Sequence, residues 1–425
     1  MQERWQSNLA ALWLSQLMAM IAFSSVMPFL PLYVQELGVT DLRQVAFWAG
    51  LLGSSAAISM AIMAPIWGNL ADRHGRKLML VRSMFGGGAV VGAMSLVRGV
   101  HELLLLRTVQ GSLSGTVTAA RVLAASIVPA ERLGFAMGLM QTAVFVGSSA
   151  GPAFGGLLSD RYGYRATFVF TGVTLALSGI AVSLLVRERF ERPAATAKAS
   201  GSSLILGVRL VLRSEQLLAM IVSLFLVQVA GMVISPILPL FIQSLSAPDQ
   251  PVASTAGIIM GTTAGSSALA AIVLGRVSDR VGYRRILMVC AVGAGLLYVP
   301  QIFVRSTWEL LALRAVLGLF MGGVMPTAMA IIGIVTPPES RGWVYGLTAS
   351  ASSLGNAVGP MLGATVTATL GLRSVFAVTA VFLTVVGLWV ARVVREPELA
   401  AATSRAGSPS KVAEAGAAGT PSPGL

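Results

Sequence analysis

The sequence is poor in the residues that most enzymes and metal-binding proteins use. It contains one cysteine, Cys290, and two histidines, His74 and His101. One cysteine excludes an intramolecular disulfide and a cysteine-based zinc site, and both histidines fall in predicted loops without further metal ligands beside them. No stretch has the G-x-x-x-x-G-K-[ST] pattern of a nucleotide-binding loop. We therefore expect no enzyme activity, no metal, no cofactor and no direct use of ATP.

Charge is also scarce. Charged residues make up 11% of the chain, hydrophobic residues make up 55%, and the mean hydropathy is +0.79. A soluble domain carries roughly 25% charged residues. Uncharged runs recur, and the run from Leu133 to Ser159 is long enough to cross a bilayer core of about 30 Å as a helix. The composition predicts a chain embedded in lipid.

Charged and turn-rich segments divide the chain into about twelve apolar runs, six in each half. They predict an all-α membrane protein with twelve transmembrane helices in two pseudo-symmetric six-helix bundles. The expected spans are 8–34, 45–66, 79–97, 103–126, 135–158, 164–186, 214–243, 253–274, 286–304, 308–335, 342–369 and 373–394. The expected domains are an N-terminal half (1–186), a cytoplasmic linker (187–213), a C-terminal half (214–394) and a disordered cytoplasmic tail (395–425).

The net charge of +13 is explained by topology. With these spans, most of the 30 lysines and arginines fall on one side of the membrane. The positive-inside rule then places both termini and the linker in the cytoplasm of a multi-pass cell-membrane protein. No nucleic-acid partner is needed, and we expect a monomer. The opposite side receives Arg43, Arg98, Arg161, Arg165, Arg305 and Arg373, and three arginines fall within spans: Arg107, Arg121 and Arg314.

The chain is an internal duplication. Asp72 and Asp279 are 207 positions apart (279 − 72), and the same shift carries Arg107 to Arg314. A shift of 208 carries Pro28 to Pro236 (236 − 28). We call residues related in this way counterparts. A repeat near half the length of so apolar a chain is typical of transporters built from two related halves.

One loop carries a distinctive pattern. Residues 68–77 are G-N-L-A-D-R-H-G-R-K, and 275–284 are the weaker copy G-R-V-S-D-R-V-G-Y-R. By itself the pattern indicates a tight helix reversal, where glycine permits close approach and Asp72 can satisfy a helix N-terminus or pair with a neighbouring cation. It resembles the loop 2–3 signature of the major facilitator superfamily, and within it the chain looks like the twelve-helix drug:proton antiporters. The resemblance implies a cytoplasmic latch made of Gly68, Asp72, Arg73, Gly75, Arg76 and Lys77, with Asp279 and Arg280 in the copy.

A glycine-rich run lies in the fifth expected span. Glycines four positions apart share one helix face, so a neighbouring helix can pack almost backbone to backbone, and proline bends the span. The run is similar to the antiporter motif of the exporters of this family, which implies export. Its residues are Gly147, Gly151, Pro152, Gly155 and Gly156.

Arginines inside the spans indicate functional positions. A charge at the centre of a span costs about 2.5–3.5 kcal/mol on insertion scales, so Arg107 and its counterpart Arg314 need a cavity or a partner, unless they snorkel to the surface. The family resemblance links Arg107 to proton transfer. Arg121 has Ala328 as its counterpart, and on a continuous helix it lies about 40° from Arg107, so both could line one channel wall. The alternative for Arg121 is a cation that complements a helix C-terminus.

No acidic residue falls in the middle of an expected span. The nearest acids are Glu36, Glu102 and Glu309, although an acid that begins a helix also complements its dipole. The candidates for proton coupling are Glu36 and Glu102, together with Arg107 and Arg314. An interior with arginine and without acid argues against a strong preference for cationic substrates. Candidates for the substrate cavity are Arg121, Gln16, Gln141, Gln228, Asn356, Phe23 and Phe145.

These features predict a proton-driven secondary exporter of small amphipathic compounds that works by alternating access. Its partners would be a small-molecule substrate, protons and the lipid bilayer. One alternative is an exporter of an anionic metabolite or a sugar-like substrate, suggested by Arg121 and the missing acids. A second alternative is a membrane sensor that has lost transport.

Overall fold

The computed structural model describes residues 2–188, 211, 214–247, 250–337 and 340–394. Within these ranges the side chains of residues 2–4, Asp72, Ala130 and Gly342 are not described. The described chain is helical, with no β-strand. The expected tail (395–425) and most of the expected linker (187–213) lie outside the described residues.

Each half contributes one group of helices. The helices of the N-terminal half are α1 (Gln2–Val26), α2 (Leu30–Glu36), α3 (Leu42–His74), α4 (Arg76–Ala93), α5 (Val100–Leu113), α6 (Thr116–Ile127), α7 (Leu133–Tyr162) and α8 (Tyr164–Leu185). Those of the C-terminal half are α10 (Glu215–Ile234), α11 (Leu238–Leu245), α12 (Val252–Val281), α13 (Tyr283–Gln301), α14 (Thr307–Val335), α15 (Arg341–Leu370) and α16 (Ser374–Val393).

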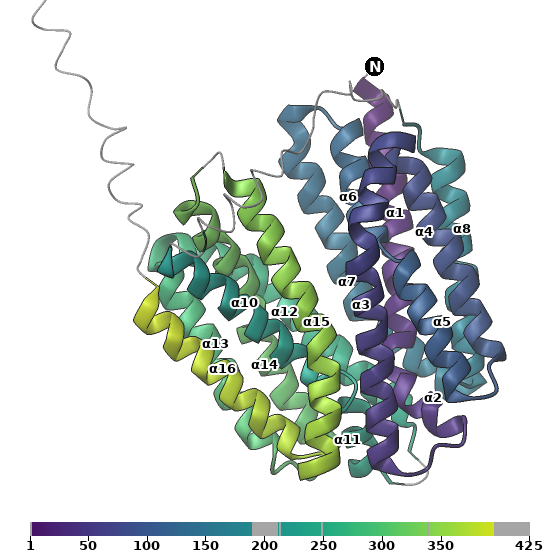
Figure 1. Ribbon diagram of the computed structural model, residues 1–425, viewed down its shortest axis with the longest axis vertical. Helices are drawn as coiled ribbons and strands as arrows, with labels where there is room; N and C mark the ends of the chain where they lie inside the picture. The colour runs from purple at the N-terminus through teal and green to yellow at the C-terminus, as the bar shows by residue number, and fades with distance from the viewer. Residues whose placement is uncertain (1, 189–210, 212–213, 248–249, 338–339, 395–425) are drawn as a thin grey trace, which may run out of the picture.

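The two groups form two bundles side by side (Figure 1). The N-terminus lies at the top of this view and α2 and α11 lie at the bottom, so we call the two ends of the molecule the upper and lower faces. The described helices make twelve crossings between these faces, which confirms the predicted fold class. Ten of the segments are long and apolar enough to cross a membrane, and α5–α6 and α15 supply the remaining two crossings.

The outer surface of the bundles suits lipid. Large apolar side chains such as Ile62, Leu184, Leu269 and Val381 are more than 60% exposed on helices that cross the structure. So many exposed apolar side chains on helices long enough to span a membrane match contact with hydrocarbon. The chain is therefore an integral membrane protein.

Glycines with positive φ make the tightest helix reversals, in matching pairs. Gly75 joins α3 to α4 with φ +99°, and its counterpart Gly282 joins α12 to α13 with φ +106°. Gly163 and its counterpart Gly371 make the α7–α8 and α15–α16 reversals with φ +83° and +90°. An L side chain is disfavoured at such angles, so the duplicated glycines preserve the duplicated turns.

Three expected spans are divided in the structure. The first and seventh are interrupted near Pro28 and Pro236, where α1 gives way to α2 and α10 gives way to α11. Proline removes a backbone donor and so interrupts a helix. The prediction of one continuous helix over 103–126 is wrong, because α5 ends at Leu113 and α6 begins at Thr116. Gly115 between them has φ +133°.

Candidate transport pathway and its gates

The glycine motif of α7 has two faces that serve two different interfaces. On the first, Gly147, Gly151 and Gly155 pack on α1 of the same half. A Cβ at Gly155 would lie 2.1 Å from the carbonyl oxygen of Ser25, so only glycine allows this approach. The counterparts Gly355, Gly359 and Gly363 pack α15 on α10 in the same way. The backbone-to-backbone packing expected from the sequence is present in both halves.

The second face of the motif crosses to the other half. A Cβ at Gly156 would lie 2.3 Å from the carbonyl oxygen of Ala253 on α12, and a Cβ at Gly257 would lie 2.2 Å from the carbonyl oxygen of Pro152. The counterpart interface joins α3 to α15, where a Cβ at Gly50 would lie 2.7 Å from the carbonyl oxygen of Pro360. The two bundles therefore meet through two related seams of near backbone contact.

Polar contacts join the halves close to the lower face. Gln35 on α2 and its counterpart Gln243 on α11 exchange two amide hydrogen bonds, 2.9 and 3.0 Å long. The Asp160 carboxylate, at the end of α7, accepts hydrogen bonds from the backbone N–H groups of Ala253 at 3.3 Å and Ser254 at 2.7 Å. This carboxylate caps the first turn of α12, where the helix dipole favours a negative charge. We call these two contacts the lower clasp.

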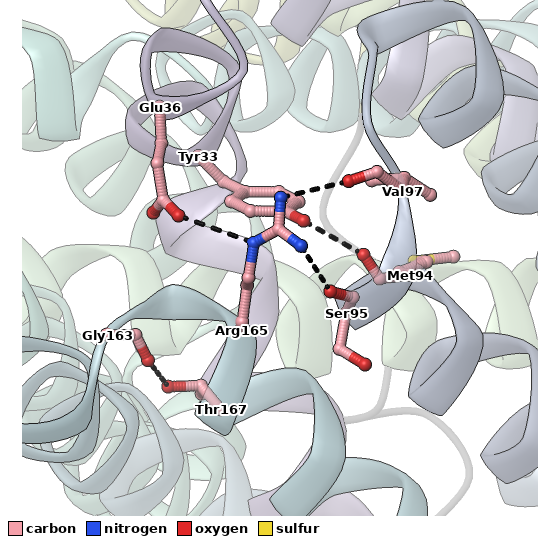
Figure 2. Close-up of polar contacts among 8 residues, drawn as sticks. All are labelled: Tyr33, Glu36, Met94, Ser95, Val97, Gly163, Arg165 and Thr167. Carbon is pink, nitrogen blue, oxygen red and sulfur yellow. Dashed lines mark hydrogen bonds and ion pairs between the residues drawn. The ribbon is translucent and has the colours of Figure 1, made fainter.

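Glu36, which follows Gln35 in the sequence, forms a surface ion pair with Arg165 (Figure 2). Its carboxylate is 3.6 Å from Arg165 Nε, and both side chains are more than 40% exposed. Arg165 also donates to the carbonyl oxygens of Ser95 and Val97, each at 3.0 Å. Its counterpart Arg373 likewise donates to a carbonyl oxygen, that of Ile302. Glu36 has Ser244 as its counterpart, so the acid is specific to the N-terminal half.

Arg107 and Arg314 are buried within their bundles, each 5% exposed. Arg107 donates to Gln110 Oε1 at 2.5 Å, and Gln110 donates to Ser114 Oγ at 2.8 Å. The guanidinium carbon of Arg314 lies 5.5 Å from the ring centroid of Tyr298. These geometries do not match the snorkelling alternative, because the guanidinium groups stay inside the protein instead of reaching its surface.

Arg121 lies partly exposed on α6 and donates a hydrogen bond to Gln141 on α7. Trp13 Nε1 on α1 donates to Thr142 Oγ1 at 3.0 Å, one residue further along α7. In the other half, Gln228 Nε2 donates to Asn356 Oδ1 at 2.6 Å, joining α10 to α15. The expectation that Arg121 lies about 40° from Arg107 depended on one continuous helix, and the end of α5 at Leu113 removes that premise.

The remaining cavity candidates are more enclosed. Gln16 is fully buried, and neither polar atom of its amide group finds a hydrogen-bond partner among the described residues. Phe23 and Phe145 are partly buried. Gln16 therefore faces the interior of the N-terminal bundle in this conformation.

The acids occupy helix ends. Glu102 accepts a hydrogen bond from Arg98 N at 2.8 Å, and Glu309 accepts one from Arg305 N at 3.0 Å, so both act as caps at helix starts. Wherever acidic side chains are described, each lies in a loop or in the first or last turn of a helix. Only cations were expected in mid-span, and the structure adds a fourth: Arg82, near the start of the expected span 79–97, lies within the α4 crossing.

The loop at residues 68–77, which we call the signature loop, is joined to the chain just after α8 by Glu188, a residue without a predicted role. The Glu188 carboxylate accepts hydrogen bonds from Arg76 N at 2.9 Å and Lys77 N at 2.8 Å, and so caps α4. Lys77 Nζ donates to the carbonyl oxygen of Ser183 at 2.8 Å. An acid directly after an expected span was the only signal for Glu188.

The other signature residues are less engaged. The side chain of Asp72 lies outside the described part, and Arg73 and Arg280 are exposed. Asp279 accepts a hydrogen bond from the Tyr283 hydroxyl. The close approach expected at Gly68 is absent, because a Cβ there would meet nothing within 4 Å.

Two bundles of related helices, joined through glycine seams and carrying polar side chains in an apolar interior, define a carrier of the alternating-access class. The chain belongs to the Major Facilitator Superfamily, whose family model matches residues 12–254 and again 220–422. The predicted family is thereby confirmed.

Full-length relatives support the same assignment. The chain is 36% identical over 376 residues to the Multidrug resistance protein MdtG of Dickeya zeae, which covers 88% of this chain and 91% of the relative. It is 37% identical over 380 residues to the protein of that name from Citrobacter koseri, and the match covers 88% of this chain and 92% of the relative.

Solved structures share the fold at low sequence identity. A bacterial homolog of the human lysosomal transporter Spinster has a TM-score of 0.75 at 17% identity, covering 91% of this chain and 96% of its own. A D-xylose-proton symporter has a TM-score of 0.73 at 15% identity, and the match covers 92% of this chain and 99% of the symporter.

Proposed function

We propose that this protein exports small amphipathic compounds from the cytoplasm by proton antiport. The observation that carries the proposal is the likeness, over 88% of the chain and more than 90% of the relatives, to proteins named for multidrug resistance. Because the likeness spans both halves, it includes the seams and the interior on which a transport cycle depends.

We place the upper face in the cytoplasm. The upper-face reversals carry Arg76 and Lys77 in one half and Arg284 and Arg285 in the other, in line with the positive-inside rule. The lower clasp and the contacts at Gly156 and Gly50 then close the extracellular side. The conformation is accordingly inward-facing, and substrate enters between the halves from the cytoplasm.

We assign substrate contact to the polar pairs that link helices in the interior. Arg121 with Gln141 offers a cation and amide groups, Trp13 offers an aromatic surface, and Gln228 with Asn356 offers neutral donors and acceptors in the other half. Mixed apolar and polar walls suit amphipathic ligands of varied shape. Phe23, Phe145 and Gln16 belong to the same proposed cavity.

We assign proton coupling to Glu36 and Arg107. Glu36 is paired with Arg165 at the proposed extracellular side, where a proton enters, and buried Arg107 heads a hydrogen-bond chain through Gln110 to partly buried Ser114. Arg314 is the second buried cation of this kind. Glu102 is a weaker candidate, because its carboxylate caps its own helix.

We assign the latch of the outward-facing state to the signature loop, with Asp72, Arg73, Arg76 and Lys77 on the N-terminal half. The Glu188 cap on α4 holds this loop in place. Asp279 and Arg280 take part in the copy. We further propose that the carrier works as a monomer, since its pathway lies between the two halves of one chain.

A second candidate function is export of anionic compounds. It is favoured by one specific observation: mid-crossing charges among the described side chains are cationic, namely Arg82, Arg107, Arg121 and Arg314. In a low-dielectric interior, an excess of cations attracts an anion and repels a cation.

The two candidates are separated in proteoliposomes with an imposed pH gradient, by comparing a cationic with an anionic fluorescent dye. We expect gradient-dependent transport of the anionic dye to fall roughly 10-fold in Arg121→Ala, because a hydrogen bond to a charged group contributes about 1.5–3 kcal/mol. The matched control is Arg98→Ala, an exposed arginine on the lower face.

Transport of the cationic dye that is unaffected by Arg121→Ala would contradict export of anionic compounds as the function and would agree with drug:proton antiport. Transport of neither dye, in the presence of a verified gradient, would contradict broad export altogether.

A further inference from the structure

The fourth crossing is broken in one half only. Between α5 and α6, Gly115 adopts φ +133°, a region that glycine reaches far more readily than other residues. Its counterpart, Gly322, lies inside α14, which runs without interruption from Thr307 to Val335. The break is therefore present in one copy of the duplicated unit and absent from the other.

Two side chains hold the broken end. A helix C-terminus leaves carbonyl oxygens without partners in the helix. Trp67 Nε1, on α3, donates to the carbonyl oxygen of Ser112 at 2.6 Å. Arg82, on α4, donates from Nη2 to the carbonyl oxygen of Leu113 at 3.4 Å. A cation at this end also complements the α5 dipole.

The two side chains also hold each other. The guanidinium carbon of Arg82 lies 3.4 Å from the centroid of the Trp67 ring, which is a close cation–π contact. Arg82 Nε and Nη1 are buried and find no hydrogen-bond partner in the described part of the chain. Arg82 is partly buried, and its guanidinium group lies between the indole ring of Trp67 and the carboxyl end of α5.

Neither residue is duplicated. The counterpart of Trp67 is Leu274 and that of Arg82 is Val289, so the pair and the break occur together in one half and are missing together in the other. In the unbroken α14, the equivalent carbonyl groups lie within the helix and need no outside donor.

The break separates two polar groups of the proposed pathway. Below it, Arg107 and Gln110 on α5 form a hydrogen-bond chain that ends at Ser114, the residue after the helix. Above it, Arg121 on α6 contacts Gln141. Gly111 fixes α5 against α3, since a Cβ there would lie 2.2 Å from the carbonyl oxygen of Ala56. With α5 anchored, the geometry of the break decides where α6 carries Arg121.

We propose that Trp67 and Arg82 are positioning residues that hold the α5 carboxyl end open and so set the place of Arg121 relative to Arg107. A continuous helix would rotate and shift Arg121, because the two residues at the break have non-helical angles. The claim about substrate rests on the proposed function, whereas the claim about helix geometry does not.

The test converts the pair to its counterparts, in the variant Trp67→Leu/Arg82→Val. Spin labels at exposed Leu105 on α5 and Ala125 on α6, in a Cys290→Ser background, report the distance across the break in the full-length protein. We expect this distance to change, and we expect the KM for the transported dye to rise about 10-fold while the maximal rate changes less than about 3-fold. The control is Trp308→Leu, which removes a tryptophan that is 77% exposed.

Conservative single variants cover the case in which the double variant does not fold. Trp67→Phe keeps an aromatic face and removes the N–H donor, and Arg82→Lys keeps the charge. We expect Trp67→Phe to raise KM and Arg82→Lys to retain more affinity than Arg82→Val. A KM change without a distance change would overturn the proposal in favour of direct substrate contact, and unchanged distance and KM would overturn it outright.

A distance change without a KM change would overturn the positioning role. A wild-type protein that transports no dye would count against the proposed function alone, since the distance measurement needs no transport.

Discussion

Valine at Gly156 is expected to abolish transport while leaving the N-terminal bundle folded. The Cβ would lie 2.3 Å from the carbonyl oxygen of Ala253 and 2.8 Å from the Cα of Ser254, and both atoms belong to the backbone of α12. Neither can yield by a side-chain rotation, so α7 and α12 must separate. Overpacking of this kind costs about 3 kcal/mol, which lowers the population of the lower-closed state roughly 150-fold.

The matched control is Gly138→Val on the same helix, where an added Cβ would meet nothing within 4 Å. Both substitutions exchange a helical glycine for the same β-branched residue, so any difference reports the seam. The measurement is the initial rate of dye transport in proteoliposomes at equal protein content. Equal rates for the two variants would show that the α7–α12 seam is not required to close during transport.

Loss of the lower clasp is expected to open the proposed extracellular side. In Asp160→Ala/Gln243→Leu, α12 loses its cap and Gln35 loses its partner, while each bundle keeps its own packing. The reciprocal amide pair and the partly exposed cap contribute roughly 2–3 kcal/mol together, so the closed population falls about 30- to 150-fold relative to the open one.

Spin labels at the exposed counterparts Arg98 and Arg305, in a Cys290→Ser background, measure the separation of the halves at the lower face. We expect a longer distance component to appear in the double variant. Asp41→Ala is the control. Asp41 accepts a hydrogen bond from Arg43 N at 3.2 Å and so caps α3 within its own half. An unchanged distance distribution would show that the glycine seams alone keep this face closed.

Much of the architecture could be predicted because it depends on local composition and on repetition. Apolar runs long enough for a bilayer, basic reversals and a shift of 207 or 208 positions indicated twelve crossings in two halves. The glycine motif also indicated its packing, because the spacing of residues along a helix decides which of them share a face.

The second role of that motif was not predictable in the same way. Spacing shows that Gly156 points away from Gly147 and Gly151, but it does not identify the helix that it meets. Only the arrangement of the two bundles brings Gly156 to Ala253. Likewise, nothing in the sequence paired Gln35 with Gln243, although their counterpart positions place both near the axis that relates the halves.

The break in the fourth crossing was missed because its signals are weak in sequence. The Ser114–Gly115 pair lies within an apolar run, and glycine is common in transmembrane helices, so the continuous span was the simpler prediction. The residues that stabilise the break, Trp67 and Arg82, come from two other helices. Arg82 falls near the start of the expected span 79–97, and nothing in the sequence indicated its contact with Trp67.

By itself, the sequence determined the class of protein, the number and approximate limits of its crossings, the duplication and the small-residue faces, because these follow from apolar length, charge placement and helical period. The tertiary structure alone decided which glycines join helices within a half and which join the halves, where α5 ends, and which face is closed. Those outcomes depend on contacts between residues far apart in the chain, and in a bilayer such contacts are selected by close packing and by the need of each buried polar group for a partner.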